Sequence, residues 1–159
     1  MDPIYLAFPL LTATPHRFVT PADGRYNCTA WAAGETHRNW WPVNFPGAPS
    51  YYWPPGVPRL LTIDAFVQAY ATLGYVRCDS SLPESGYEKI ALYAQGELPT
   101  HAARLRPNGN WSSKLGKDRD IEHVLGGLTS QQYGRPVCYL RRPIPEKKGT
   151  KEKKGKKRR

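Results

Sequence analysis

Six prolines fall within residues 37–58, and they divide the chain into two parts of different character. Proline has no backbone N–H and a fixed φ, so a regular helix is excluded here and a long strand is disfavoured. Helix signals lie on both sides of this segment, whereas strand signals lie only after it. We therefore expect an α+β fold, in which N-terminal helices pack on a small antiparallel sheet.

The proline-rich segment also carries six aromatic residues, of which Trp40 and Trp41 are adjacent. An irregular stretch of about 20 residues inside a compact domain is often functional. Two interpretations stay open. The segment forms an aromatic wall that contacts substrate beside an active site, or it forms a hydrophobic lid that closes one side of the core.

Two helices are predicted from their start and stop signals. The first begins at Cys28, after a polar and glycine-containing approach, and ends at Gly34. The second covers residues 62–74, where Thr62 is the expected N-cap, apolar residues recur at helical spacing and Gly74 ends the helix. We expect the second helix to be part of the scaffold.

Strand-like runs fill the second half of the chain, at residues 75–78, 87–94, 100–105, 111–115 and 136–142. Residues 121–125 are predicted as a short turn of helix or a strand. The Asn108-Gly109 pair between two of these runs is the strongest short signal for a hairpin. If this pair forms the centre of the turn, His101 lies opposite Gly116, with Ser113 in its neighbourhood on the next strand.

The net charge of +10 is unevenly distributed. Residues 146–159 hold nine Lys or Arg and two Glu, which leaves only +3 for residues 1–145. We predict a single domain over residues 1–145, beginning with an irregular arm over residues 1–24, and a disordered basic tail over residues 146–159. The tail is a candidate for contact with nucleic acid or an anionic surface, or it has no specific partner.

Cysteine number and hydropathy bear on the compartment. Three cysteines, spaced 50 and 60 residues apart, match neither a disulfide scaffold nor a zinc-ligand pattern, and they favour a reducing environment. The chain has no transmembrane run of the roughly 20 residues that a span requires, and its start lacks the features of a signal peptide. We expect a cytoplasmic protein, with export that needs no cleaved signal left open, and neither a metal nor a cofactor.

Cys28 is the candidate nucleophile. At the first turn of a helix, unpaired N–H groups favour the thiolate and lower the pKa of a cysteine. A nucleophilic cysteine also needs a base, and His101 opens a strand whose neighbour can supply a polar group to orient the imidazole. The alternatives are an inert, buried Cys28 and a purely structural His101.

Lys114 follows two serines in a predicted central strand, where an unpaired buried charge would be destabilising. Three interpretations stay open for this side chain. It points outward, it pairs with Glu88 or Asp120, or it raises the electrostatic potential near the thiolate of Cys28.

The order of these parts resembles papain-like cysteine hydrolases, especially the compact bacterial cell-wall endopeptidase branch. The stretches that carry the likeness are residues 27–31, 100–103 and 111–116. Together with residues 87–94 and 120–123, they are also similar to a family of bacterial proteins of unknown function, over about residues 25–142.

The sequence departs from the endopeptidase pattern at two positions. Asn27 precedes the cysteine where those enzymes usually have Asp, and Ser113 stands where they usually have His, Asn or Gln. Asp120 or His123 is an alternative third residue if the intervening loop folds back.

The resemblance implies a papain-like fold and a hydrolase or acyl transferase of the thiol protease or amidase kind. Its substrate would be an amide, ester or thioester, most simply a protein or peptide. Cys28 would attack, His101 would move the proton, and the Cys28 N–H, joined by Asn27, would stabilise the oxyanion. The predicted substrate contacts are Asn27, Trp31, Trp40 and Trp41.

By analogy alone, such compact bacterial domains serve as toxins, effectors or defence components. A second hypothesis is a binding module on the same scaffold that has lost activity and holds a protein or peptide partner with its aromatic segment. A third is a nucleic-acid-associated protein recruited by its basic tail.

Overall fold

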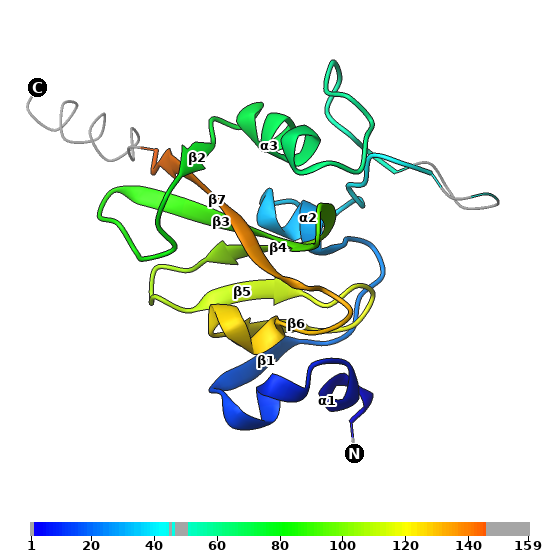
Figure 1. The fold of residues 1–159 in the computed structure, drawn as a ribbon, viewed down its shortest axis with the longest axis vertical. Helices are drawn as coiled ribbons and strands as arrows, with labels where there is room; N and C mark the ends of the chain where they lie inside the picture. The colour runs from blue at the N-terminus through cyan, green and yellow to red at the C-terminus, as the bar shows by residue number, and fades with distance from the viewer. Residues whose placement is uncertain (1, 45, 47–50, 146–159) are drawn as a thin grey trace, which may run out of the picture.

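The computed structural model describes residues 2–44, 46 and 51–145, and the predicted tail over residues 146–159 lies outside this part. A seven-stranded antiparallel sheet dominates the described chain, in the order β1-β6-β5-β4-β3-β7-β2 (Figure 1). The strands are β1 (His16–Thr20), β2 (Val76–Cys78), β3 (Tyr87–Gln95), β4 (Leu98–Leu105), β5 (Trp111–Lys114), β6 (Asp120–His123) and β7 (Arg135–Pro143).

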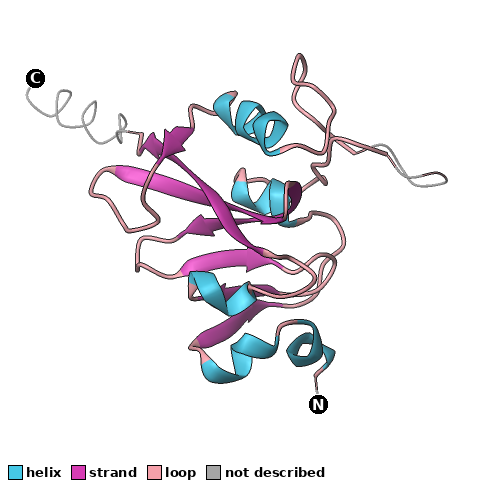
Figure 2. Ribbon diagram, viewed as in Figure 1, coloured by secondary structure: helices cyan, strands magenta, loops and turns pink. Residues whose placement is uncertain are grey.

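The helices are few and short (Figure 2). They are α1 (Pro3–Ala7), α2 (Cys28–Ala32) and α3 (Ile63–Ala71), with the 3-10 turns η1 (Pro9–Ala13) and η2 (Leu125–Leu128). The expected α+β, papain-like arrangement of N-terminal helices on a small sheet is therefore wrong. The N-terminal arm, expected to be irregular, supplies β1, and the predicted Cys28 helix has only five residues, so strands outweigh helices.

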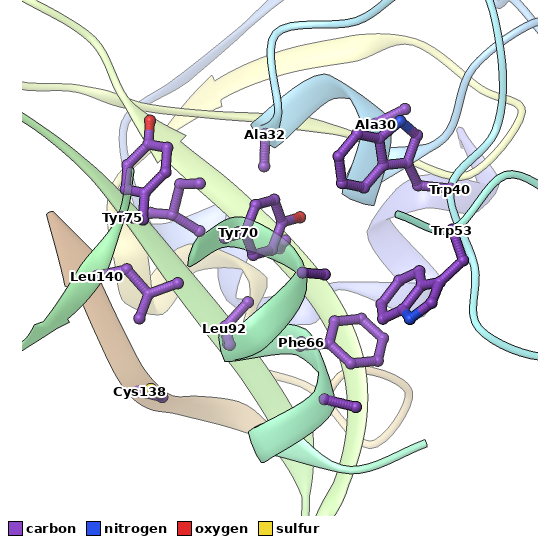
Figure 3. Packing of buried hydrophobic residues seen from close by; sticks show 14 of the residues in the cluster. Ala30, Ala32, Trp40, Trp53, Phe66, Tyr70, Tyr75, Leu92, Cys138 and Leu140 are labelled. Carbon is purple, nitrogen blue, oxygen red and sulfur yellow. The ribbon is translucent and has the colours of Figure 1, made fainter. Parts of the chain in front are cut away.

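Alternation along the strands builds two apolar layers, one on each face of the sheet. On β3, Ile90 and Leu92 face the layer with α2 and α3, whereas Ala91 and Tyr93 face the layer with α1, η1 and η2. Figure 3 shows the first layer, where side chains of α3 and β7 meet the aromatic segment. Its large buried members include Trp40, Trp53, Phe66, Tyr70, Leu92 and Leu140.

The predicted helix over residues 62–74 is present as α3. Thr62 caps it by accepting a hydrogen bond from the Ala65 N–H at 3.1 Å, and Gly74 follows its end with φ of +95°. Phe66 and Tyr70 are fully buried on its inner side. None of the helices in the described ranges is long and apolar enough to cross a lipid bilayer.

The predicted hairpin over β4 and β5 forms, but its register differs by one residue. Arg104 pairs with Ser112 and Leu105 with Trp111, because the Arg106 N–H bonds the Asn110 carbonyl at 2.8 Å around a three-residue loop. Gly109 takes the left-handed conformation that such a loop requires, with φ of +87°. On β4, only Arg104 and Leu105 pair with β5 in the described structure. The residues at the start of β4 therefore have no β5 partner on that side.

Candidate functional site

Asn27 fixes the start of α2 and joins it to the aromatic segment. Its Oδ1 accepts from the Ala30 N–H at 3.1 Å and from the Trp40 N–H at 3.0 Å. Its Nδ2 donates to the Trp40 carbonyl at 2.7 Å. The side chain predicted to assist an oxyanion is therefore engaged in a cap and in a bridge between two segments.

Cys28 is the first residue of α2, and it is 7% exposed. Burial raises the pKa of its thiol, and this effect outweighs hydrogen bonds from the Ala102 backbone and the Thr29 side chain, which lower it. The Cys28 Sγ and the Thr29 Oγ1 are 3.7 Å apart. The prediction that the helix start lowers this pKa is wrong, because desolvation of a thiolate is the larger effect here.

His101 belongs to a buried hydrogen-bond chain that crosses three strands and ends on the backbone. Its Nε2 lies 2.9 Å from the Ser113 Oγ, and the same Oγ lies 2.7 Å from the His123 Nε2. The His123 Nδ1 lies 2.7 Å from the carbonyl oxygen of Val124. The structure thus joins three of the sequence candidates, with His123 reached through Ser113.

The last link fixes the direction of every hydrogen bond in this chain. The Val124 carbonyl can only accept, so the His123 Nδ1 carries a hydrogen. Burial lowers the pKa of His123 to about 4, so near pH 7 its Nε2 is bare and accepts from the Ser113 hydroxyl. Ser113 in turn accepts from the Nε2–H of His101, which leaves the Nδ1 of His101 bare.

The bare Nδ1 of His101 is buried and has no hydrogen-bond partner among the residues that the structure describes. Burial, with a contribution from His123, holds the pKa of His101 well below its ordinary value, so this imidazole is neutral near pH 7. A neutral imidazole with a lone pair on Nδ1 is the form that can accept a proton from a thiol.

Cys28 and His101 both lie near the first half of β4, but they belong to different layers. The ring of His101 stacks on Tyr133, with centroids 4.1 Å apart, and meets Tyr93 edge-on, in the layer of α1, η1 and η2. Cys28 comes from the α2 layer to the backbone N–H of Ala102, where the β4–β5 ladder is open. The charge of Cys28 contributes to the raised pKa of Tyr133, the ring that stacks on His101, and no hydrogen bond joins the sulfur to the imidazole among the described residues.

Asp120, the other predicted catalytic residue, stands outside the hydrogen-bond chain of His101. Its Oδ2 accepts from the Tyr26 hydroxyl at 2.9 Å, and its Oδ1 is buried without a partner in the described part of the chain. Asp120 is the cross-strand neighbour of Lys114 in the β5–β6 pair. Its place is therefore beside the lysine, on the α2 side of the sheet.

Lys114 is fully buried and does not point outward. Its ammonium donates to the Gly116 carbonyl at 2.6 Å and to the Asp23 carbonyl, and it lies 4.8 Å from the centroid of the Tyr26 ring. Burial lowers its pKa, while the charges of Asp120, Asp23 and Cys28 act in the opposite direction. Among the described residues Lys114 forms no ion pair with Glu88 or Asp120, so of the three interpretations its electrostatic effect on Cys28 is the one that the structure favours.

The three predicted substrate-binding tryptophans occupy different environments. Trp40 is buried and donates to Glu35 at 2.7 Å, so for this residue the structure favours the lid over the core. Trp41 is half-buried against Phe66, with ring centroids 5.4 Å apart. Trp31 is half-buried too, and its indole N–H donates to Ser112 at 3.1 Å.

Sequence reasoning missed Tyr133 and Val124. Both follow β6 in loop or turn positions, and neither residue type in such a place signals a role beside an imidazole. Their contacts with His101 and His123 arise from the return of the chain between β6 and β7. Within the described ranges, no group of three His, Cys, Asp or Glu side chains is arranged to hold a metal ion.

The chain belongs to a protein family described as a domain of unknown function, DUF7689, whose model matches residues 17–141. The match runs from β1 to β7 and so contains Cys28, His101 and the hydrogen-bond chain. Neither the curated proteins nor the solved structures contain a match to this chain. The resemblance to a family of unknown function is therefore supported, whereas the papain-like resemblance finds no support in these comparisons.

Proposed function

We propose that this protein is a cysteine-dependent hydrolase or acyl transferase, with Cys28 as nucleophile and His101 as base. One observation supports this most strongly. The hydrogen-bond chain from Val124 holds His101 in the tautomer whose bare Nδ1 is buried and unpartnered. Burying a lone pair without a donor is unfavourable, so such an atom suggests a partner that arrives during the reaction.

In the proposed first step, the Cys28 sulfur attacks a substrate carbonyl carbon while its proton passes to the Nδ1 of His101. The new carbon–sulfur bond gives a tetrahedral oxyanion, for which the Cys28 backbone N–H at the helix start is the proposed donor. His101 then protonates the departing nitrogen, oxygen or sulfur as its bond to carbon breaks. The product of this step is a thioester on Cys28.

In the second step, water or another acceptor attacks the thioester and gives its proton to His101, which returns it to the Cys28 sulfur. Because burial raises the pKa of Cys28 and lowers that of His101, the resting pair is a neutral thiol and a neutral imidazole. Proton transfer must therefore accompany the attack. The positive charge of Lys114 then favours the thiolate as it forms.

A binding module without activity is the second candidate, and the burial of Cys28 is the observation that favours it. Such a protein would keep the aromatic segment and the hydrogen-bond chain as scaffold. It would tolerate Cys28→Ala without loss of function, whereas an enzyme would not.

An acylation experiment separates the two candidates. The protein is treated with p-nitrophenyl acetate, and acetyl groups on each cysteine are mapped by mass spectrometry of peptides. We expect a burst of p-nitrophenol and an acetyl group on Cys28, both lost in His101→Ala. Cys78, which is half-buried on β2, is the internal control and should acquire acetyl groups at the same rate in both proteins. Equal labelling of Cys28 with and without His101 would contradict the enzyme.

A further inference from the structure

A cavity of about 580 Å³ opens beside the segment that leads into α2. Three guanidinium groups line it, those of Arg25, Arg38 and Arg59, together with His37, Asn39, Tyr51 and Tyr52. Aromatic and amide groups with several guanidinium forks are suited to a ligand that has both an apolar part and an anionic group.

The arginines that line this cavity and their carboxylate partners leave an excess of one positive charge, and His37 is a further titratable group of the lining. Asp23 binds Arg25 at 2.7 Å, and Glu35 binds Arg38 at 2.6 Å, so two of the three cations have carboxylate partners. Among the described residues, Arg59 has no ion pair. A single excess charge matches a carboxylate better than a dianionic phosphate.

Two of the cationic groups are held in place before any ligand binds. Arg38 lies over the ring of Tyr52, with its guanidinium carbon 3.5 Å from the centroid. Arg25 is held by hydrogen bonds from its Nε and Nη2 to Asp23. Such preorganisation reduces the entropy lost on binding.

The cavity also lies close to the candidate nucleophile. Cys28 follows Arg25 by three positions, and three residue steps span at most about 11 Å between Cα atoms. The two walls are tied together, because Asn39 donates to the Gly24 carbonyl at 3.5 Å. The cavity wall that Arg25 forms is therefore close in the chain to the first turn of α2, where Cys28 lies.

We propose that this cavity binds a carboxylate of the substrate, so that the substrate class is a peptide or acyl compound with a carboxylate near the scissile bond. This inference rests on the proposed function, because it treats the bound compound as a substrate. Binding in the cavity does not itself require catalysis. A side-chain carboxylate and a carboxylate at a chain end present the same anionic group to the arginines of the cavity.

The test measures binding to Cys28→Ser, which keeps the cavity and lacks the thiol. Five probes are titrated by NMR, namely N-acetylglutamate α-methylamide, N-acetylglycine, the neutral amide counterpart of each, and methyl phosphate. We expect each acid to bind about fivefold to tenfold more tightly than its amide. The stronger of the two acids identifies the source of the carboxylate.

Arg59→Gln should remove the preference for acids, and Arg17→Gln is the matched control, since Arg17 pairs with Glu122 at another surface. Equal binding of acids and amides, or a preference that survives Arg59→Gln, would overturn the proposal. Tighter binding of methyl phosphate than of either acid would overturn the assignment to carboxylate. None of these measurements depends on turnover. A negative binding result would therefore leave the conclusion from acylation of Cys28 unchanged.

Discussion

The hydroxyl of Ser113 lies 2.7 Å from the Nε2 of His123, and this hydrogen bond determines which nitrogen of His101 is bare. Without it, Ser113 would be able to donate to His101 and reverse the tautomer. The candidate base thus depends on a residue two strands away, which touches neither the sulfur nor the imidazole of the proposed pair.

Ser113→Ala should slow acetylation of Cys28 by p-nitrophenyl acetate about 100-fold, because His101 loses the group that fixes its tautomer. It should also lower the free energy of unfolding by about 1–3 kcal/mol, since two buried ring nitrogens lose their partner. Ser112→Ala is the matched control. That serine is also buried, but in the described part of the structure its side chain accepts from the Trp31 indole and takes no part in the chain of His101, so acetylation should stay within about twofold of the wild-type rate.

Stability should fall as the pH drops below about 6.5. Both His101 and His123 are buried and neutral, so their folded-state pKa values lie below the unfolded value. The unfolded chain therefore binds more protons, and the stabilisation present above pH 6.5 is lost as the pH falls toward the folded value of about 4 for His123. For His123 alone the loss is about 3 kcal/mol.

Urea unfolding at pH 7 and pH 5 measures this dependence. His123→Gln offers a non-titrating side chain that can still donate to Val124 and accept from Ser113. It should remove roughly half of the pH dependence and keep acetylation of Cys28 near the wild-type rate. An unfolding free energy that stays constant over this pH range would show that these imidazoles are not buried in the neutral state.

Iodoacetamide should alkylate Cys28 more slowly than Cys78 at pH 7. Burial raises the pKa of the Cys28 thiol and restricts access, whereas Cys78 is half-buried on an edge strand. Peptide mass spectrometry after short exposures gives both rates from one sample. Faster alkylation of Cys28 would indicate a resting thiolate and would contradict the neutral pair proposed for the first step.

Lys114→Met should lower the free energy of unfolding by about 3 kcal/mol, because Asp120 then lacks its nearby buried cation. Lys114→Met combined with Asp120→Asn should recover part of that loss, which a double-mutant cycle by chemical denaturation would measure. Additive effects of the two substitutions would mean that the two charges do not interact.

Local signals predicted several elements well. Thr62 and Gly74 bound a helix that buries Phe66 and Tyr70, and Asn108-Gly109 makes a hairpin. These elements follow from caps, glycine conformations and spacing, all of which act within a few residues. Sequence order also brought Ser113 and His123 into consideration beside His101.

Long-range packing accounts for what was missed. Residues 16–20 have little periodicity, and they form a strand because β6 offers an unpaired edge. The burial of Cys28 depends on how α2 meets β4, and the tautomer of His101 depends on a turn more than 20 residues away in sequence. A local sequence pattern specifies neither which distant residues surround a side chain nor the direction of the hydrogen bonds that it makes.

The hydrogen-bond chain that begins at His101 ends on the backbone carbonyl of residue 124. Every amino acid, proline included, has such a carbonyl. Replacement of the side chain at that position therefore leaves the proton arrangement intact. An insertion or deletion between His123 and η2 would move the carbonyl itself and disrupt it. We therefore expect the proton arrangement at His101 to depend on the length of this turn and not on which side chain stands at position 124.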